Sequence, residues 1–546
     1  MPQYSVIDLR FYSAIYLYSF DAIDLRLNNQ ESSLAQPHQK LADSLNRLKE
    51  LQADGRCVFR SGEFTRTHRE RLVSHGFLLE VMKGWVISIS PGVQEGDSTP
   101  WYASFWEFCA RYCQERFGTQ WHLSPEQSLL LTAGHTVIPR QLVIYSPRGT
   151  NNSVDLLFDT SLYDLKQKAM APRKDLEEVD GLRLYRPAVA LIKVPESFYR
   201  SHPVEAQVVL SQISEASELL AHLLAGGHSS VAGRLAGALR RIGRVNVADE
   251  IVTAMNSADY TIREADPFDS NRSIPEIVAS TPPIVARLRT LWETHRSVVL
   301  DQFPDKPGLP ADAGEYLDRI DEIYRSDAYH SLSIEGYRVT PELVERVKSG
   351  DWNPDSRDVD RNDRDALAAR GYWQAFKRVK DDVAEVLAGA EPGQRVRRTH
   401  QDWYRELFQP CVAAGLIGAD ALAGYRNDAV YLRGSRYVPP RPEVVRHAMP
   451  ALFDLLAEED KAAVKAVLGH WLLGYIHPYP DGNGRMARFL MNVMLASGGF
   501  PWTVVRVEDR DAYLTVLEEA SMESNILPFS KFIAERVYWS VDQVGE

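Results

Sequence analysis

The sequence has few cysteines and no long apolar run. It contains only four cysteines in 546 residues, too few for a disulfide scaffold, and Cys109 and Cys113 lack the second pair that a zinc site needs. No window of about 18 apolar residues is uninterrupted, which predicts no membrane span. The brief apolar stretch near the N-terminus has neither the basic start nor the cleavage site of a signal peptide. We therefore expect a cytoplasmic protein with reduced thiols and no membrane partner.

Positive net charge, internal repeats and low-complexity segments are also missing. Lys and Arg number 62 against 74 Asp and Glu, a formal net charge of -12, so the whole molecule should repel nucleic acid at long range unless a local basic patch binds it. The hydrophobic content of 45% is that of an ordinary globular protein. The length is sufficient for about two to four domains.

Residues 38–95 have the pattern of a compact α+β unit. A helix is predicted by leucines at helical spacing, namely Leu41, Leu45, Leu48 and Leu51. A short strand, a helix from about Thr65, a turn at Gly76 and two strands flanking Lys83-Gly84 should follow. This order resembles the winged helix of abortive-infection antitoxins and related regulators.

Such a winged helix would give the protein a DNA partner. Basic residues on and near the candidate recognition helix would then contact phosphates: Arg56, Arg60, Arg66, His68, Arg69, Arg71 and Lys83. A solvated face, or a winged helix that contacts protein, explains the same residues equally well.

We expect three domains: a winged-helix-like domain over residues 1–98, a mixed α/β domain over 99–275, and an all-α domain over 284–546. The candidate elements of the middle domain are strands at Leu142–Tyr145 and Val189–Val194 and an amphipathic helix at Glu205–Leu224. The proline-rich stretch Asp266–Pro283 is the best interdomain linker, and Asp351–Asp365 has the composition of a hydrated loop.

The string HPYPDGNGRMAR, which runs from His477 to Arg488, carries the strongest chemical signal. An apolar helix precedes it and a second helix follows it, so Asp481-Gly482-Asn483-Gly484 should lead into a helix N-terminus, which binds anions through free N–H groups and the helix dipole. The glycines allow close approach of a phosphate. A proline-terminated helix followed by a glycine turn is the alternative explanation, which the length of the string disfavours.

Each charged residue of this string has a use in phosphoryl or nucleotidyl transfer. His477 is the group whose ordinary pKa suits proton abstraction near neutrality. Arg485 and Arg488 are three residues apart and can both offer planar forks to phosphate oxygens. Asp481 supplies a hard oxygen ligand for Mg²⁺.

The string closely resembles the Fic family motif HPFxDGNGRxxR, with Tyr479 in place of the usual Phe. The resemblance covers about residues 285–540 and includes Gly424–Pro442, which looks like the family's β-hairpin flap. The flap clamps a target peptide by strand addition. The resemblance therefore implies an all-α Fic domain with a β-hairpin flap, joined to an α+β N-terminal part.

The resemblance also implies the activity and its residues. His477 would deprotonate a Ser, Thr or Tyr hydroxyl of a target protein, which attacks the α-phosphate of ATP and expels pyrophosphate. Asp481 would hold Mg²⁺, and the phosphates would be bound by Gly482, Asn483, Gly484, Arg485 and Arg488. Tyr513 is a candidate for the vicinity of the adenine. His470 is expected to be a structural histidine.

A second motif lies upstream of the catalytic string. Ser331 and Glu335 are one helical turn apart in YHSLSIEGYRVT, and Gly336 can cap the helix. Within a Fic protein this matches the inhibitory motif [S/T]xxxE[G/N], which implies an inhibitory helix near residues 325–336. Glu335 would occupy Arg488 and exclude the γ-phosphate; in the family the same glutamate can also assist removal of AMP.

Two functions follow from the sequence. The first is an autoinhibited protein adenylyltransferase that uses ATP and Mg²⁺ to modify a target protein or itself, with a homodimer as one compatible assembly. The alternative is a DNA-binding regulator or antitoxin-like protein whose Fic domain senses nucleotide. Intact His477, Asp481 and both arginines favour the enzyme.

Overall fold

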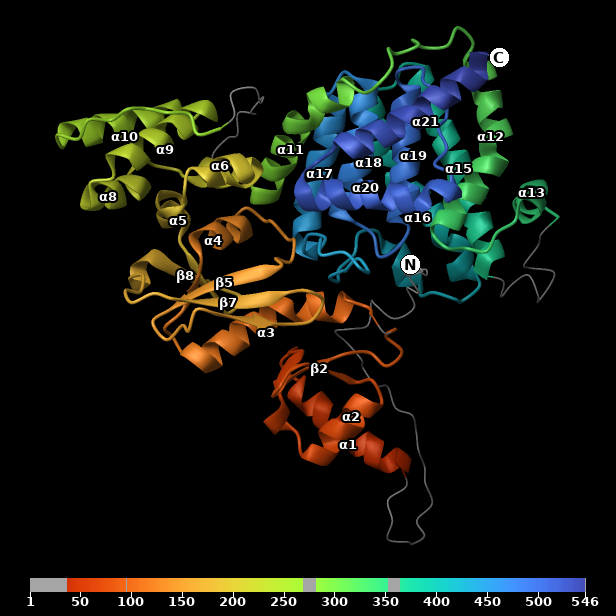
Figure 1. Cartoon of the computed structure of the whole chain (residues 1–546). Coiled ribbons are helices and arrows are strands. Elements are labelled where there is room, and N and C mark those ends of the chain that lie inside the picture. The colour runs from red at the N-terminus through yellow and green to blue at the C-terminus, as the bar shows by residue number, and fades with distance from the viewer. Residues whose placement is uncertain (1–36, 95, 269–280, 352–363, 546) are drawn as a thin grey trace.

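The computed structural model describes residues 37–94, 96–268, 281–351 and 364–545. Three parts follow one another along the chain: a small N-terminal unit, a middle part built on a mixed sheet, and a large helical part (Figure 1). None of the described helices is both long and apolar enough to cross a bilayer. Two expected segments lie largely outside the described residues, namely the linker at 266–283 and the hydrated loop at 351–365.

The N-terminal unit contains the elements expected there. Its elements are α1 (Pro37–Leu51), β1 (Val58–Arg60), α2 (Arg66–Ser74), β2 (Leu78–Met82) and β3 (Trp85–Ser88). The sheet is antiparallel in the order β1-β3-β2. Helix α2 starts where the hydroxyl of Thr65 accepts a hydrogen bond from the backbone N–H of His68 at 3.3 Å. The winged-helix assignment itself stays a prediction.

The middle part is a four-stranded sheet against helices. Its elements are α3 (Thr99–Phe117), β4 (His122–Leu123), α4 (Pro125–Thr132), β5 (Gln141–Ser146), β6 (Asn152–Asp155) and β7 (Ser161–Lys166). The strand order is β4-β5-β7-β6, with β5 and β7 parallel. The predicted strand Leu142–Tyr145 lies within β5 and is confirmed. A two-stranded sheet of β8 (Leu176–Val179) and β9 (Leu182–Tyr185) follows.

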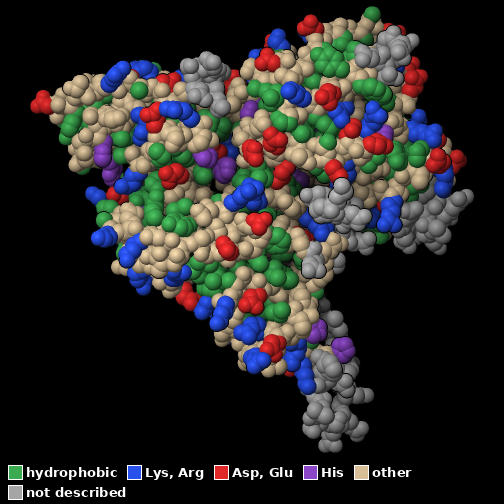
Figure 2. Space-filling model, viewed as in Figure 1, with side chains coloured by type: hydrophobic (Ala, Val, Ile, Leu, Met, Phe, Trp, Pro, Cys, Tyr) green, Lys and Arg blue, Asp and Glu red, His purple; other side chains and the backbone are tan. Residues whose placement is uncertain are grey.

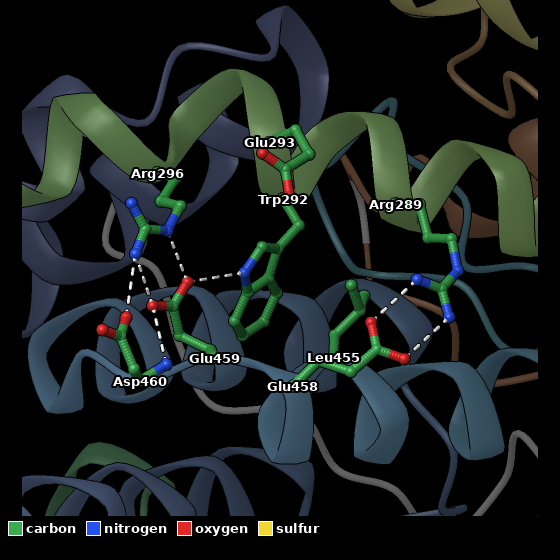
Figure 3. A pocket seen from close by; sticks show the side chains of 8 residues that line it. All are labelled: Arg289, Trp292, Glu293, Arg296, Leu455, Glu458, Glu459 and Asp460. Atoms are coloured by element: carbon green, nitrogen blue, oxygen red, sulfur yellow. Dashed lines mark hydrogen bonds and ion pairs between the residues drawn. The ribbon is translucent and has the colours of Figure 1, made fainter. Parts of the chain in front are cut away.

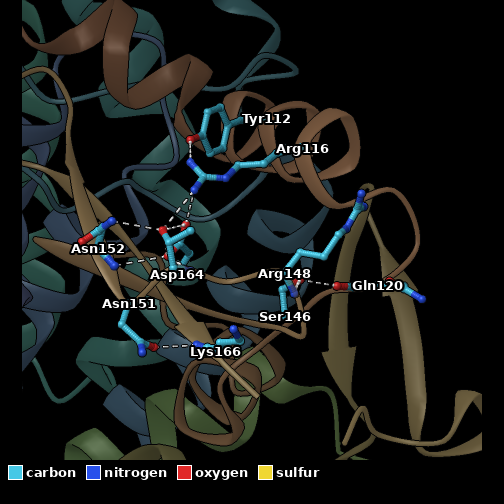
Figure 4. A network of polar contacts seen from close by, with 10 residues as sticks. Tyr112, Arg116, Gln120, Ser146, Arg148, Asn151, Asn152, Asp164 and Lys166 are labelled. Atoms are coloured by element: carbon cyan, nitrogen blue, oxygen red, sulfur yellow. Dashed lines mark hydrogen bonds and ion pairs between the residues drawn. The ribbon is translucent and has the colours of Figure 1, made fainter. Parts of the chain in front are cut away.

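A polar network ties this sheet to α3 (Figure 4). Asp164 on β7 forms an ion pair with Arg116 on α3 at 2.6 Å. It also accepts hydrogen bonds from the N–H and the hydroxyl of Thr150 at 2.8 and 2.9 Å. The hydroxyl of Ser146 donates to the carbonyl of Gln120 at 2.7 Å. Because the Asp164 side chain is only 5% exposed, these bonds compensate the cost of burying its charge.

Two predictions in the middle part are wrong. The predicted strand Val189–Val194 is instead helix α5 (Pro187–Lys193), because a short apolar run does not distinguish a strand from a buried helix and Pro187 suits a first helical turn. The predicted helix Glu205–Leu224 is two helices, α7 (Pro203–Gln212) and α8 (Ser217–Gly226). Between them, the Glu218 carboxylate accepts bonds from the N–H groups of Ser214 and Glu215, which starts a new helix.

The rest of the middle part is helical. After α5 come α6 (Ser197–Ser201), α7, α8, α9 (Ser229–Arg241) and α10 (Val245–Ser257). Their apolar faces belong to the same buried cluster as the C-terminal helices, so the middle part and the helical part share a core.

The described residues of the C-terminal part form helices and no strand, as predicted, and α11 starts at Pro283. Its helices are α11 (Pro283–Leu300), α12 (Ala313–Ile334), α13 (Pro341–Ser349), α15 (Arg364–Leu387), α16 (Pro392–Ala413), α17 (Pro442–Glu458), α18 (Ala462–Ile476), α19 (Asn483–Ala496), α20 (Arg510–Glu523) and α21 (Leu527–Gly545). Helices α18 and α19 lie in the middle of this bundle (Figure 1), and nearly every residue of both is buried.

The predicted β-hairpin flap is not a hairpin in the structure. Residues 424–441 are turns and extended backbone without a strand, between a 3₁₀ turn at Ala419–Ala423 and α17. The physical reason is that backbone groups that a hairpin would pair with each other bond to other parts of the chain: the Arg426 N–H donates to the carbonyl of Pro478 at 2.9 Å, and the carbonyl of Arg436 accepts from Ile138 at 2.8 Å. Within the segment, the Arg426 guanidinium donates to the carbonyls of Asp428 and Pro440. We call residues 424–441 the flap segment below.

Candidate active site at the α18–α19 loop

The loop between α18 and α19 is rigid because its own polar groups are bonded within it. His477 ends α18 in the left-handed conformation with φ 50° and ψ 59°, and Gly482 precedes α19 with φ 81°. The amide of Asn483 accepts from the N–H of Tyr479 at 2.9 Å and donates to its carbonyl at 2.8 Å. Both ends of the Asn483 side chain are therefore used by the loop, so only its backbone remains for a phosphate.

Tyr479 anchors the loop in the core. Its ring is buried and stacks on Tyr404 of α16 with centroids 4.1 Å apart and planes 11° apart. The hydroxyl has no hydrogen-bond partner among the residues that the structure describes. The aromatic position is thus retained, while the extra phenol oxygen that distinguishes this string is buried unpaired.

His477 is held from the flap segment. The Arg426 guanidinium donates to the carbonyl of His477 at 2.7 Å. Burial, and after it the charge of Arg426, lower the pKa of the His477 imidazole to about 4, although the Gly474 carbonyl and Glu335 act in the opposite direction. The imidazole is therefore neutral at physiological pH, which is the state that accepts a proton.

Arg485 forms one side of an anion site at the start of α19. Its side chain is 1% exposed and lies between the rings of Tyr337 and Phe408, with centroids 5.3 and 5.0 Å from its guanidinium carbon. Asp481 lies 3.4 Å from the Nη2 atom. Gly482 is needed here, because a Cβ at that position would come within 2.9 Å of Phe408.

Both arginines of the motif have buried N–H groups that no acceptor among the described residues satisfies. Within the described part of the chain, the Nε and Nη2 atoms of Arg485 and the Nη1 atom of Arg488 have no hydrogen-bond acceptor. A buried donor without an acceptor costs free energy, so three of them around one helix N-terminus fit a site whose acceptors come from a ligand. Phosphate oxygens have the geometry that guanidinium forks bind.

Glu335 is bonded to the second arginine of the motif, Arg488. Its carboxylate accepts from Arg488 Nη2 at 2.7 Å, while Arg488 Nε donates to the Ser331 hydroxyl at 2.9 Å and Nη2 also reaches the Ser331 carbonyl at 3.1 Å. Burial raises the pKa of the Glu335 carboxyl, but Arg488 and Arg485 outweigh burial and hold the pKa below its ordinary value. The structure thus brings together the two residues of the upstream motif and the last arginine of the catalytic string.

Glu335 also touches the glycine turn. A Cβ at Gly484 would lie 2.3 Å from the Glu335 carboxylate oxygen, so only glycine lets this carboxylate come so close to α19. Helix α12 ends at Ile334, and Gly336 follows with φ 83°, which confirms the expected glycine cap.

Asp481 can bind a metal ion only if a bound substrate supplies further oxygen atoms to that ion. One carboxylate oxygen accepts from the N–H of Gly482 at 2.5 Å, and the side chain is 28% exposed. No cluster of three or more His, Cys, Asp or Glu side chains able to hold a metal ion occurs among the described residues. Mg²⁺ commonly takes one or two carboxylates, and phosphates and water complete its shell, so a single exposed carboxylate beside an anion site suits it.

Tyr513, a candidate for the adenine, lies in the core. Its side chain is 2% exposed and its hydroxyl bonds to His470 Nε2 at 2.7 Å. The other faces of the ring are covered by Phe529 and Phe532. Burial lowers the pKa of His470 to about 3, so it is a neutral structural histidine, as expected. With no open face, Tyr513 offers nothing for a base to stack on, and we leave it out of the nucleotide site.

Three residues of the site carry no signal in the sequence. Arg426 is a single arginine in a loop, and Phe408 and Tyr337 are ordinary aromatic residues of α16 and of the turn after α12. Each reaches the motif only through tertiary packing. A pattern search restricted to the motif has no means of finding them.

A surface depression elsewhere in the helical part has its charges already paired (Figure 3). It lies between α11 and the end of α17, where Arg289 pairs with Glu458 at 2.9 Å and Arg296 with Glu459 at 2.8 Å. Trp292 donates to Glu459 at 3.3 Å. Because these donors and acceptors satisfy each other, this depression is a weaker ligand site than the α18–α19 loop.

Comparison with known proteins agrees with the geometry. Residues 394–495, which include the whole catalytic string, match the sequence model of the Fic/DOC family. The chain is 39% identical over 264 residues to Protein adenylyltransferase Fic of Nematostella vectensis, which is 44% of this chain and 54% of that protein. It is 29% identical over 255 residues to Protein adenylyltransferase Fic of Drosophila virilis, which is 45% of this chain and 48% of that protein. The chain thus spans about half the length of these relatives.

A solved structure is also similar in part. Fic-1 (aa134 - 508) from C. elegans matches 60% of this chain and 92% of its own length at 18% identity, with a TM-score of 0.35.

Proposed function

We propose that this chain, which carries a Fic/DOC family domain over residues 394–495, is an autoinhibited protein adenylyltransferase. It transfers AMP from ATP to a hydroxyl side chain of a target protein or of itself. The observation that carries the proposal is the neutral imidazole of His477 next to a helix N-terminus where, among the described residues, three guanidinium donors have no hydrogen-bond acceptor. Base and anion site are the two components that nucleotidyl transfer requires of a protein.

The proton and the phosphate are handled by different residues. His477 takes the proton of the target hydroxyl while the hydroxyl oxygen bonds to the α-phosphorus of ATP. The bond from this phosphorus to the bridging oxygen breaks, and pyrophosphate leaves with the electron pair. Arg485 and Arg488 bind the phosphate oxygens, and the backbone N–H groups at Gly482, Asn483 and Gly484 provide the helix N-terminus. Rigid positioning by Asn483 and Tyr479 lowers the entropy cost of the in-line geometry.

Magnesium is the proposed metal, with Asp481 as its protein ligand. Mg²⁺ bound there would neutralise phosphate charge. The Asp481 carboxylate also lies near Arg485, so in the free protein it partly balances that buried guanidinium.

Glu335 is the proposed brake. Its carboxylate occupies the Arg488 donor that a γ-phosphate would use, and Ser331 holds a second donor of the same guanidinium. ATP bound alongside this pair lacks a full set of phosphate contacts and is poorly aligned for attack. The family that this chain resembles can use the same glutamate to assist the removal of AMP, and we propose that reverse reaction for Glu335 as well.

The test uses ATP labelled at the α-phosphate and three forms of the full chain. Glu335→Gly should incorporate label into itself or into proteins of a cell extract much faster than the wild type. Adding His477→Ala to Glu335→Gly should abolish labelling, a loss of about 10²–10⁴ in rate, while ATP affinity measured by calorimetry stays close to that of Glu335→Gly. Equal labelling with and without His477 would refute the mechanism.

A further inference from the structure

The flap segment has an occupant from elsewhere in the chain. The loop of residues 134–140, which joins α4 to β5, lies against it: the N–H of Ile138 donates to the carbonyl of Arg436 at 2.8 Å. The Arg436 guanidinium returns a bond to the carbonyl of Ile138 at 2.9 Å. Both polar groups of the Ile138 backbone are thus used by one residue of the flap segment, the N–H by its backbone carbonyl and the carbonyl by its side chain, and the first of these bonds is of the kind that an added strand makes.

The flap segment also holds the catalytic loop, so its occupant is close to the chemistry. Arg426 donates from its backbone to Pro478 and from its side chain to His477. At the other end, the Tyr437 hydroxyl donates to the carbonyl of Tyr475 at 2.5 Å, two residues before His477. A target peptide that pairs with the backbone near Arg436 would present its hydroxyl to this same loop.

The 134–140 loop is also bonded, through His135, to a buried charge network. His135 Nδ1 bonds to Glu205 at 2.9 Å, Glu205 pairs with Arg287 at 2.8 Å, and Arg287 donates to the Tyr475 hydroxyl at 2.7 Å. The side chains of Arg287 and Glu205 are 2% and 5% exposed. The loop contributes only His135 to this network, since Arg287 lies on α11 and Glu205 on α7. The His135–Glu205 bond adds to the two bonds of Ile138 in holding the loop in its docked position.

Further contacts cover the flap segment from the same side. Arg433 donates to Gln94 at 2.6 Å, and Arg441 pairs with Asp180. Tyr431 and Val438 pack against the buried cluster formed by the N-terminal unit and the sheet of the middle part. Four points along the flap segment are therefore in contact with the first 180 residues or so of the chain.

We infer that the 134–140 loop occupies the place where the backbone of a target protein binds, so that the N-terminal half acts as a second brake. Glu335 opposes productive ATP binding, whereas the loop opposes target binding; the two act on different substrates of one reaction. Full activity then requires the loop to leave Arg436. This inference rests on the proposed adenylyltransferase function.

A reversible crosslink tests it in the full chain. The variant carries Glu335→Gly together with Ile138→Cys and Arg436→Cys; the 2.8 Å bond from the Ile138 N–H to the Arg436 carbonyl brings the two backbones close, and a disulfide spans Cα separations of about 4.4–6.8 Å. Mass spectrometry of the oxidised protein should find the 138–436 crosslink. Labelled AMP incorporation into protein should be at least about tenfold slower in the oxidised form than after reduction. ATP affinity should be the same in both forms.

The matched controls are the two single-cysteine variants in the same Glu335→Gly background, whose labelling should not respond to reductant. Equal labelling of the crosslinked and reduced protein, or failure of the crosslink to form, would overturn the inference. If Glu335→Gly without added cysteines labels nothing and does not bind ATP, the proposed function itself fails, and the inference falls with it.

A second measurement does not depend on labelling. Amide hydrogen exchange of residues 430–441 should be slower in the oxidised than in the reduced double-cysteine protein, because a loop that opens spontaneously is held closed by the crosslink. Identical exchange in the two forms would mean that the loop does not open, and would refute the second brake even if the substitutions impaired labelling by themselves.

Discussion

The carboxylate of Glu335 and the guanidinium of Arg488 are joined at 2.7 Å across two helices that lie 153 residues apart in the sequence. The pair exists because α12 ends at Ile334 and points its last turn at the first turn of α19, and because Gly484 leaves room for the carboxylate. It fills the position that a phosphate would need. The resting structure is thereby stabilised by a contact that the proposed reaction has to break.

The charge of Glu335 should matter more than its size. Glu335→Gln keeps the side chain next to Gly484 but removes the ion pair with Arg488, so it should label faster than the wild type and more slowly than Glu335→Gly. If the pair contributes about 1–3 kcal/mol, the rise over wild type is about 5–150-fold. Labelled ATP incorporation measures it. A Gln variant as inactive as the wild type would show that bulk, and not charge, is responsible.

The pH dependence of labelling should lack the usual histidine step. Burial and Arg426 lower the pKa of His477 to about 4, so the neutral imidazole persists until the pH falls to that value. Glu335 raises this pKa, and Glu335→Gly therefore does not bring it back towards 6.5. Labelling by Glu335→Gly should be flat from about pH 8 to pH 5 and then fall.

The same shift has a consequence for stability. Between about pH 6.5 and pH 4 an unfolded His477 binds a proton that the folded one does not, so its contribution to the free energy of unfolding is lost as the pH falls through this range.

For the labelling experiment, ATP binding measured over the same pH series separates effects on the nucleotide from effects on the base. A midpoint of labelling near pH 6.5 would contradict an imidazole with a lowered pKa.

Tyr479 should be replaceable by the phenylalanine that the Fic motif has at this position. Its hydroxyl is buried without a partner among the described residues, while the ring stacks on Tyr404. Tyr479→Phe removes the unpaired oxygen and keeps the stacking, so the free energy of unfolding should rise by about 1 kcal/mol. Thermal unfolding followed by calorimetry measures this change.

Tyr437→Phe is the matched control, because the Tyr437 hydroxyl donates to the carbonyl of Tyr475 at 2.5 Å. Removing this donor leaves a buried acceptor unpaired and should lower the free energy of unfolding by about 1 kcal/mol. Tyr479→Phe should thus raise the free energy of unfolding and Tyr437→Phe should lower it, although both substitutions remove one phenol oxygen. Destabilisation by both would indicate that the Tyr479 hydroxyl has a partner after all.

The sequence was sufficient for the parts of the site that depend on local structure. His477, Gly482 and the start of α19 lie within one short string, and Glu335 and Gly336 end a helix by a recognisable cap. Geometry within one turn follows from residue types and spacing. The position of Glu335 against Arg488 came from the resemblance to a family and not from spacing.

What the sequence could not predict depends on long-range contacts. The flap segment was expected to pair with itself, yet Arg436 bonds to Ile138, almost 300 residues earlier. Arg287, Glu205 and Tyr475 form their network from three distant segments. The run Val189–Val194 was mistaken for a strand because its apolar residues fit either a strand or a buried helix.

The alternative function, DNA binding by the N-terminal unit, makes a testable prediction of its own. Most of the basic side chains expected to contact phosphates are bonded within the protein. His68 and Arg71 bond to Ser44 at 2.9 and 2.8 Å, Arg56 pairs with Glu63, and Arg60 pairs with Glu115. Figure 2 shows basic and acidic side chains mixed over this unit in the face that it displays, without a stripe of one charge.

We therefore expect no shift of DNA from the protein's own upstream region in a gel assay at about 0.15 M salt, since non-specific affinity requires several free cations along one face. Arg66 and Arg69 are the basic residues of α2 that a DNA phosphate would meet most easily, because Arg66 makes only an exposed pair with Glu70 at 2.7 Å. A shift that weakens steeply with salt and disappears in Arg66→Glu/Arg69→Glu would contradict this expectation and support the regulator. Labelling by the Glu335→Gly form of that double variant should be unchanged, because neither arginine contacts the catalytic string or the flap segment.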